Sequence, residues 1–554
     1  MNGFLRFYEV SILNASYKDI SAKTAQIKFF NKSGGVINVL EYAYLEAAEV
    51  YEKIQNNEPV ILDNCYIKDF SLSTFKKNQN IADNEYIKLK GFSAENAFFD
   101  CEFEVDFSHA EFQSAKISFK NTRFGDGNKR FYKTVFGEGD IDFSNTYWGR
   151  GNVDFQMAEI DKGNINFENA RFSEGDISFV NTHFGDGKVN FKNVRFGDGE
   201  VDFHYSRFGK GVKTFDKAEF GKGLKDFRKI EFGSGRLDFK RVYFNDGDVL
   251  FDESEIISGK CNFRGASFGN GKISFDLTNF GKDEVLLEKI DFSGKILSFY
   301  QCWGNIVSLE GCQLNCFIDL RVNHIKYLNL SNTILRDIID LKKVDTPQKI
   351  DRINLHGMRN LGQILIDWKE NNVYNAITNN KEHSMGEIAE QFLLLKENFN
   401  NTGQYNDEDR AYVAFKRFEL EHITTQKIAK NPKNKYWMLP LYWFEKLVFD
   451  KMGLYATAPL RVFVSMTIVF SVYSIIYTIV PYISSSEIIC PQEYTDFLHR
   501  LGNAFYYSAI TFLTVGYGDC LPTGIFKVLA PLEGWMGVFM MSYFTVAFVR
   551  KILR

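Results

Sequence analysis

The chain has 554 residues, of which 45% are hydrophobic, and its formal net charge is −4 at pH 7. This length exceeds one ordinary domain, so we expect two or more folding units. The small net charge gives no support for a nucleic-acid partner, and none is expected. The eight cysteines lack a disulfide-framework spacing, which favours a mostly cytosolic protein. Residues 1–6 lack the basic start and apolar run of a cleaved signal peptide.

Residues 1–90 have an irregular pattern, with a helix expected over residues 40–55. We expect this region to cap the first coil of the repeats that follow it, because the ends of stacked repeats must be covered.

Phenylalanine is over-used, with 55 residues, and a strict period over residues 91–300 accounts for the excess. Phe recurs at every twelfth position from Phe107 to Phe275, and Gly holds another register from Gly127 to Gly271. The alternation within each unit, [VI]-x-F-x-x-[ATV]-x-F-G-x-G-x, predicts strands with one buried face, and the glycines are expected to supply corners with positive φ. Each strand is too short to be stable alone, so we expect a right-handed parallel β-solenoid with Phe ladders inside.

This pattern resembles pentapeptide-repeat proteins, in which apolar residues five apart form a four-sided β-helix. Here, two five-residue steps are followed by a two-residue Gly insertion. We expect two of these units to form one four-sided, 24-residue coil. A two-sided, 12-residue coil made of one unit is the alternative, and the sequence leaves it open.

Two functions of the solenoid can be weighed from its charges. Gly-Asp-Gly occurs three times, but the middle position is elsewhere Arg150, Lys210 or Ser234, whereas systematic Ca²⁺ ligation needs carboxylates at fixed places. DNA mimicry would need a strongly acidic surface, but residues 101–300 carry 29 basic and 33 acidic residues. We therefore favour a rigid spacer or an interaction scaffold, which could bind an unknown cytosolic regulator.

Residues 301–380 lose the Phe-Gly register and are expected to form degenerate last coils and a cap. Cys302, Cys312, Cys316 and His324 have no zinc-site spacing, so buried core thiols are favoured over a metal site.

Apolar residues return at helical spacing over residues 381–430, with a break at residues 400–403. This predicts a helical hairpin linking the solenoid to the membrane. Its position makes it the natural transmitter of a cytosolic signal, and a passive tether is the alternative. Residues 431–459 contain the aromatic run 437–444, which predicts an amphipathic segment on the inner membrane surface or, equally, a short core helix.

Residues 460–554 contain two candidate spans. Residues 462–480 carry no charge and would extend about 28 Å as a helix, close to the hydrocarbon thickness of a bilayer. The second span covers residues 525–549 and is interrupted by Lys527 and Glu533; a carboxyl at that depth should face protein or water. Lys and Arg flank both spans on one side, whereas residues 481–498 carry only acidic charges. This asymmetry predicts a multi-pass protein of the cell inner (plasma) membrane with cytoplasmic N- and C-termini.

A pore signature lies between these spans, after a short helix expected over residues 503–513. Carbonyls can replace the water shell of K⁺ only if successive residues point the same way, which glycines permit through positive φ. The dipole at the C-terminal end of the short helix also favours a cation. The expected K⁺ selectivity filter is Thr514, Val515, Gly516, Tyr517, Gly518 and Asp519. The residues expected to support it from the pore helix are Phe505, Tyr506, Tyr507 and Thr511.

Residues 455–554 resemble the pore module of prokaryotic two-transmembrane potassium channels. The resemblance implies K⁺ as the permeant ion, held at filter carbonyls only, and a homotetramer in the lipid membrane, because four copies close the filter. It implies no other cofactor. Leu513 replaces the Thr or Ser common in such channels, which puts inner-cavity polarity in doubt. Gly537 lies where pore-lining helices of this family often bend, so it is either a gating hinge or a site of close helix packing.

The favoured function is therefore a potassium-selective channel subunit whose solenoid serves assembly, scaffolding or regulation. The alternative is a non-conducting, membrane-anchored interaction scaffold. An enzyme is the weakest interpretation, because phosphate-loop, metal-ligand and nucleophile signatures are missing. A voltage sensor is not expected, because the sequence contains no arginine-rich helix before the pore signature.

Cys490 and Cys520 fall on the outer side, and the sequence leaves open whether they form a disulfide.

Overall fold

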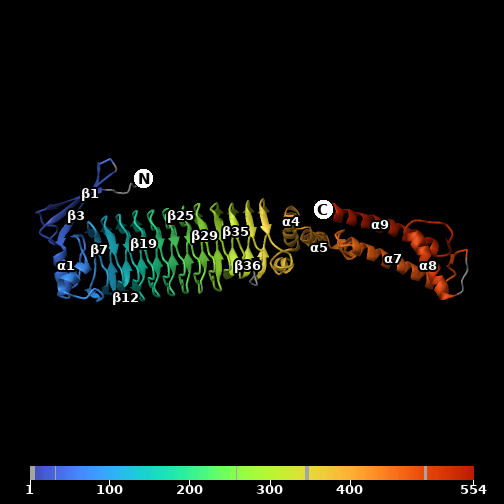
Figure 1. Ribbon diagram of the computed structural model, residues 1–554, viewed down its shortest axis with the longest axis horizontal. Coiled ribbons are helices and arrows are strands. Elements are labelled where there is room, and N and C mark those ends of the chain that lie inside the picture. The colour runs from blue at the N-terminus through green and yellow to red at the C-terminus, as the bar shows by residue number, and fades with distance from the viewer. Residues whose placement is uncertain (1–6, 32, 258, 343–348, 492–495, 554) are drawn as a thin grey trace. The chain divides into compact units, whose positions relative to one another are not determined.

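The computed structural model describes residues 7–31, 33–257, 259–342, 349–491 and 496–553. The chain forms two compact units, Met1–Asn380 and Lys381–Arg554. The first is a parallel β-solenoid and the second is helical (Figure 1).

Each coil of the solenoid contains two Phe-Gly units. Val153 pairs with Ile177, and Ile177 pairs with Val201, always in parallel register. A coil contains four short strands, as in β10 (Arg123–Phe124), β11 (Asn128–Arg130), β12 (Val135–Gly137) and β13 (Asp140–Asp142). The coil is therefore the four-sided, 24-residue form, and the 12-residue coil is excluded.

The four sides stack into sheets that run along the solenoid (Figure 1). The longest has 12 strands, from β7 (Glu104–Asp106) to β41 (Gln363–Leu365). The next has 11 strands, from β9 (Lys116–Ser118) to β39 (Lys349–Asn354). Single bridges continue the other two sides where the strands become too short to be regular.

Phenylalanines fill the interior in several sets of stacks, two of which meet edge to face. Phe143 stacks on Phe119 and Phe167 of the neighbouring coils with centroids 4.7 and 4.9 Å apart. Phe131 belongs to the second set and meets Phe143 edge to face at 5.8 Å. Burying one such ring contributes about 1.5–3 kcal/mol, so the repeat is stabilised mainly by this column of rings.

The repeat glycines are needed mainly because neighbouring coils approach each other closely, and less often because the backbone has positive φ. Gly197 lies outside the left-handed region, yet a Cβ there would collide with the carbonyl of Ser173 in the coil below. The regular positive-φ corners instead lie two residues after the inward Phe of the register that runs from Phe107 to Phe275, as at Asn145, Asn169 and Asn193. Asn tolerates this conformation. Its side chain also bonds a neighbouring coil, since the Asn169 amide donates to the side-chain oxygen of Asn145 at 3.1 Å. The expectation that Gly forms the corners was therefore wrong for many coils.

The Gly-Asp-Gly carboxylates tie neighbouring coils together. Asp126 accepts the backbone N–H of Arg150 at 3.0 Å, and Asp186 accepts that of Lys210 at 3.1 Å. These aspartates thus have a structural role that follows from the 24-residue register.

The N-terminal region is more regular than expected. Strands β1 (Phe7–Leu13), β2 (Thr24–Phe30) and β3 (Val36–Glu46) are antiparallel, and β3 joins β4 (Cys65–Lys68) in parallel. The expected helix over residues 40–55 begins only at α1 (Ala47–Gln55), where a capping box between Glu46 and Glu49 starts it. The preceding strand is rich in side chains that favour a strand, with β-branched Val36, Ile37 and Val39 followed by aromatic Tyr42 and Tyr44. A second helix is α2 (Leu72–Gln79).

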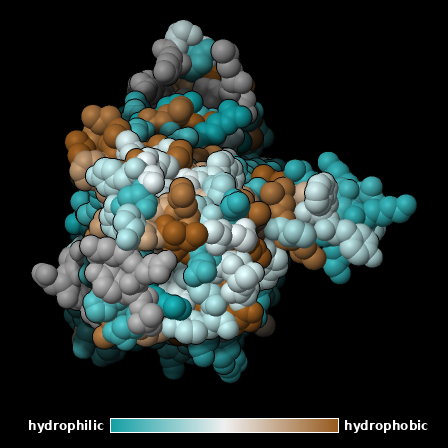
Figure 2. All heavy atoms as spheres, turned by 90° about the vertical axis from the view of Figure 1, so that its right-hand side faces the viewer, coloured by the Kyte–Doolittle hydropathy of each residue, from teal (hydrophilic) through white to brown (hydrophobic). Residues whose placement is uncertain are grey.

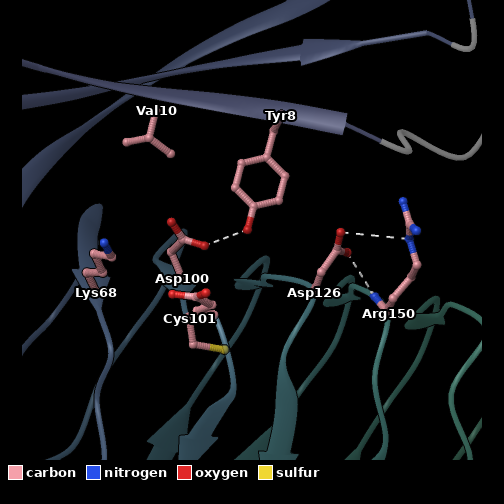
Figure 3. Close-up of a pocket in the computed structure, with 8 residues that line it drawn as sticks. Tyr8, Val10, Lys68, Asp100, Cys101, Asp126 and Arg150 are labelled. Carbon is pink, nitrogen blue, oxygen red and sulfur yellow. Dashed lines mark hydrogen bonds and ion pairs between the residues drawn. The ribbon is translucent and has the colours of Figure 1, made fainter.

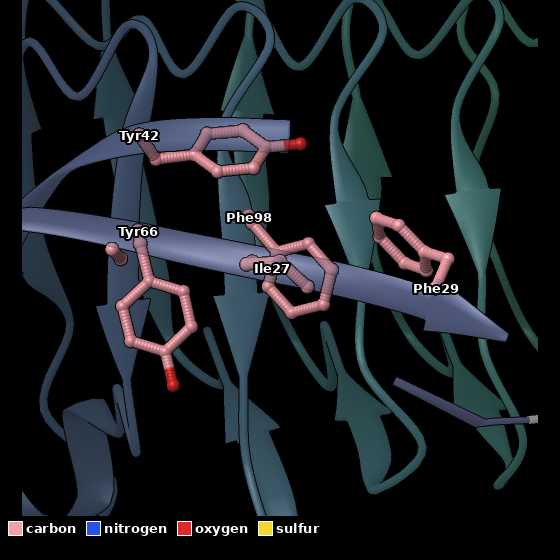
Figure 4. Packing of buried hydrophobic residues seen from close by; sticks show 6 residues of the cluster. Ile27, Phe29, Tyr42, Tyr66 and Phe98 are labelled. Carbon is pink, nitrogen blue, oxygen red and sulfur yellow. The ribbon is translucent and has the colours of Figure 1, made fainter. Parts of the chain in front are cut away.

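These strands cover an outer face of the first coils (Figure 4). Phe99 points inward and stacks on Phe124, whereas its neighbour Phe98 points outward. The outward ring is buried against Phe29, Tyr42 and other residues of β2, β3 and β4. Covering Phe98 in this way removes an apolar patch that the repeat alone would expose.

The last coils vary in length. Ile296 pairs with Phe317, which makes that coil shorter than the regular one, and Ile338 pairs with Gln363, which makes that coil longer. These irregular coils explain why the Phe-Gly register disappears although the fold continues. Cys302, Cys312 and Cys316 are buried in them, and the solenoid unit ends after α3 (Val373–Thr378).

The helical unit begins with a hairpin of α4 (Met385–Asn401) and α5 (Tyr405–Lys430). It continues with α6 (Lys435–Glu445), in which no residue is buried, and α7 (Pro459–Ile479). The remaining helices are α8 (Phe497–Phe512) and α9 (Phe526–Ile552). Within the described ranges, two segments are long and apolar enough to cross a membrane, Pro459–Tyr482 and Phe526–Ile552.

Three lysines occupy inward solenoid positions that Val or Ile fills in other coils. Lys129, Lys213 and Lys225 are at most 1% exposed. The Lys129 ammonium donates to the carbonyls of Gly149 and Arg150 at 3.0 and 2.6 Å. Burial lowers the pKa of Lys129 to about 7 and the pKa of Lys213 and Lys225 to about 8.

We predict that Lys129→Met stabilises the solenoid at pH 7, by up to about 4 kcal/mol. The pKa of Lys129 in the folded chain lies below its value of about 10.4 in the unfolded chain. At a pH between these two pKa values, the unfolded wild-type chain therefore binds more protons than the folded chain. Wild-type stability should therefore rise from pH 7 to 10, and the advantage of the variant should shrink. Unfolding midpoints followed by circular dichroism at both pH values test this. Lys120→Met, at an exposed position, is the control, and an equal pH dependence of Lys129→Met and wild type would contradict the prediction.

Candidate ion-conduction site

Helix α8 precedes the expected filter and packs between the two spans. It begins at Phe497, earlier than the expected start at residue 503, and ends at Phe512. Tyr507 of α8 contacts Tyr477 of α7 edge to face at 5.3 Å, and Phe505 contacts Phe470 of α7 at 4.8 Å. Both aromatic residues thus support the helix from the side of the first span.

The segment after α8 alternates in backbone handedness. Thr514, Gly516 and Gly518 have φ values of 58°, 58° and 77°, whereas Val515 and Tyr517 lie outside the positive-φ region. Positive φ is unusual for a β-branched residue such as Thr514, and such strain persists only where surroundings enforce it. The backbone N–H groups of Val515 and Gly516 both donate to the carbonyl of Ile510, at 2.8 and 3.3 Å.

A hydrogen bond joins the pore helix to the far end of this segment. The Tyr506 hydroxyl donates to a carboxylate oxygen of Asp519 at 2.9 Å. Of the three expected aromatic supports, only Tyr506 makes this contact, whereas Phe505 and Tyr507 face α7. The backbone carbonyl of Thr511 accepts the N–H of Thr514 at 3.1 Å. These contacts fix the segment at both of its ends.

Glu533 of α9 is fully buried and holds three helices together. Its carboxylate accepts hydrogen bonds from the hydroxyls of Tyr477 in α7, at 2.8 Å, and Ser508 in α8. Sequence reasoning placed Glu533 against protein or water, and the structure places it against protein. The two partners were missed, because no sequence signal pairs a Ser and a Tyr with a distant Glu.

Gly537 lies where α9 crosses the end of α8. A Cβ at this position would collide with the carbonyl group of Phe512, two residues before Thr514. Close packing therefore accounts for glycine here, and the hinge role remains a prediction. The contact brings α9 directly against the base of the expected filter.

A disulfide joins Cys490 to Cys520. Beside it, β42 (Ile488–Ile489) pairs antiparallel with β43 (Leu521–Pro522). The loop after the first candidate span is thus attached to the residues that follow the expected filter. The six other cysteines are free and buried.

A shallow pocket of about 550 Å³ lies beneath β1 in the solenoid unit (Figure 3). Three of its charged groups have partners: Asp100 accepts from Tyr8 at 2.5 Å, and Asp126 pairs with Arg150 at 3.7 Å. The pocket residues thus stabilise the contact between β1 and the first coils, and we assign no chemistry to them.

A group of possible metal ligands was missed by sequence reasoning, which found no metal-ligand cluster. The ligand atoms of Asp202, His204 and Asp226 lie within 4.8 Å of one another. Only the two-unit coil brings Asp226 beside Asp202, so no local spacing reveals the group. Asp226 already binds the Arg228 guanidinium through both carboxylate oxygens, which makes it a poor metal ligand.

Comparison with known proteins agrees with the geometry of the helical unit. A family model described as an ion channel matches residues 462–554, from the first span to the C-terminal end of α9. Searches of curated proteins and of solved structures returned no match. The C-terminal part of this chain is therefore an ion-channel domain of the two-transmembrane type, preceded by a parallel β-solenoid compatible with pentapeptide repeats.

Proposed function

We propose that the channel conducts K⁺ selectively through Thr514–Asp519. The observation that supports this most directly is the alternating handedness at Thr514, Gly516 and Gly518. Alternation is the backbone property that lets successive carbonyls replace the water shell of a dehydrated ion. The C-terminal end of α8, where its dipole favours a cation, leads directly into this segment.

We further propose a homotetramer, because one chain leaves the filter wall incomplete. Val515 is 48% exposed and Tyr517 is 72% exposed. A Cβ added at Gly516 or Gly518 would meet no atom within 4 Å. Four copies around one axis would enclose the carbonyls and cover these side chains.

The remaining surface of the helical unit suits a membrane. Apolar side chains of the spans are exposed, among them Ile468 at 58% and Trp535 at 71%. Figure 2 views the molecule from the end where Figure 1 labels α7, α8 and α9, and brown apolar residues are scattered among paler ones. We propose that lipid and neighbouring subunits cover them.

We propose an orientation in the cell inner (plasma) membrane with both termini cytoplasmic. The Cys490–Cys520 disulfide supports an outer position for the loop after α7, because disulfides persist in oxidising compartments. The exposed rings of Tyr436 and Trp437 in α6 support its placement on the inner membrane surface. In this orientation the solenoid lies in the cytosol, available for assembly, scaffolding or an unknown regulator.

The test is K⁺ flux into liposomes that contain the purified full-length protein. We expect K⁺ flux to exceed Na⁺ flux strongly and Gly516→Ala to abolish it, because alanine is strained at φ 58°. Gly502→Ala is the matched control, since Gly502 lies in α8 with open space around it. Equal permeability to both ions, or undiminished flux in Gly516→Ala, would refute the filter assignment. Absence of flux would favour a non-conducting, membrane-anchored scaffold.

We also predict that Tyr506→Phe weakens the filter, because it leaves the Asp519 carboxylate without this donor. A hydrogen bond to a charged group contributes about 1.5–3 kcal/mol, so the K⁺ concentration that protects the oligomer from heat dissociation should rise roughly tenfold or more. Gel mobility after heating over a K⁺ series measures this. Tyr436→Phe, whose ring is 85% exposed, is the control. An unchanged K⁺ requirement would show that the bond does not support the filter.

A further inference from the structure

The cytosolic end of α9 is held to the hairpin by a cluster of ion pairs. Arg550 contacts Asp409 at 3.2 Å and Glu408 at 3.5 Å, and Lys551 contacts Asp409 at 3.0 Å. The side chains of Glu408 and Asp409 are only 3% and 11% exposed. We call Glu408, Asp409, Arg550 and Lys551 the hairpin latch.

Helix geometry and a neighbouring ring reinforce the latch. Its acidic residues lie in the first turn of α5 or just after it, and its basic residues lie in the last turn of α9, so each set complements the dipole of its own helix. The Arg550 guanidinium also lies 4.4 Å from the ring centre of Tyr412. Because the carboxylates are buried, removing their cationic partners would leave charges that water cannot fully solvate.

A second contact attaches α9 to the chain just before the first span. The Tyr543 hydroxyl donates to the carbonyl of Phe449 at 3.1 Å and accepts the N–H of Ala456 at 2.9 Å. Leu454, Tyr455 and Ala456 have φ values of 46°, 54° and 62°. We call residues 449–457 the elbow.

The elbow is a strained conformation. A left-handed residue other than Gly costs roughly 1–2 kcal/mol, and three in succession are unusual. Such a segment persists only when its surroundings hold it, and Tyr543 bonds both ends of the turn. Movement of α9 would therefore remove a restraint on the elbow.

The other half of α9 supports the filter. Glu533 binds Ser508 of the pore helix, and Gly537 lies against the Phe512 carbonyl. Helix α9 is continuous from Phe526 to Ile552, so about 20 Å of helix connects Gly537 to Arg550. A displacement of the latched end is thus transmitted along one element to the base of the filter.

We propose that the hairpin latch is the regulatory site through which the hairpin controls conduction. This inference rests on the proposed channel function. In the latched state the hairpin fixes the cytosolic end of α9 and Tyr543 holds the elbow. A force on α4 and α5 separates the ion pairs, frees that end of α9 and lets the elbow relax, which changes the support of the filter.

The test compares full-length variants in liposomes by K⁺ flux. Glu408→Lys with Asp409→Lys, and separately Arg550→Glu with Lys551→Glu, place like charges across the latch. We expect each pair to change the initial flux rate at least fivefold, both in the same direction. Combining all four substitutions restores attraction and should return the rate to within about threefold of wild type. The remaining difference is expected because the swapped charges now oppose the unchanged dipoles of α5 and α9.

Matched variants separate this effect from a general charge effect. Lys430→Glu reverses one charge at the other end of α5, where the described residues form no ion pair with it, and should leave the rate unchanged. Tyr543→Phe should shift the rate in the same direction as the latch variants, because it removes both elbow hydrogen bonds. Unchanged flux in both latch pairs, or no recovery in the four-residue swap, would overturn the proposal.

Hydrogen exchange of α5 and the end of α9, in the same liposomes, gives a second measurement that does not depend on flux. Faster exchange in the latch pairs, reversed by the swap, is expected. If wild type conducts no K⁺, the proposed function fails, and the exchange data still show whether the latch exists. If exchange changes while flux does not, the latch is structural only and its regulatory role is refuted.

Discussion

The helical unit depends on one buried carboxylate. A charged or polar group at membrane depth must find partners within the protein, because lipid provides none. Glu533 finds them in Tyr477 and Ser508, which belong to two different helices. These hydrogen bonds fix α8 between the spans, and α8 in turn sets where Thr514 begins. The position of the proposed filter thus depends on the hydrogen bonds of Glu533 and on the absence of a side chain at Gly537.

Much of the solenoid could be predicted, because its interior repeats. Most inward Phe rings stack on an equivalent Phe one coil away, so the period of the core appears directly in the sequence. The sequence period did not settle the coil length, because a coil of one Phe-Gly unit and a coil of two units would both bury these rings. The role of Gly197 was misjudged for a related reason: contact with a neighbouring coil leaves no local sign.

In the candidate site, too, local features could be predicted from the sequence, whereas contacts between distant residues could not. The residues from Thr514 to Asp519 were predicted because the backbone itself requires Gly at alternating positions. The Tyr506–Asp519 and Ser508–Glu533 hydrogen bonds were not, because each depends on how helices pack in three dimensions. The disulfide between Cys490 and Cys520 was left open, since its formation depends on the pairing of β42 with β43. Sequence thus predicted the residues proposed to contact the ion and named Tyr506 as a support, but it missed the partner of Tyr506 and the residues that hold Glu533.

The two interpretations of Gly537 are compatible once the contacts of α9 are taken together. On one side of Gly537, Glu533 fixes the helix to α8. On the other side, Tyr543, the hairpin latch and the packing of Phe544 against Phe463 hold the helix to the rest of the unit. If the latch opens, a restraint is lost only in this second half, so a bend would occur near the boundary. A glycine selected for close packing against Phe512 stands at this boundary, and it also lowers the cost of bending there. Close packing and bending therefore need not be alternatives at this position.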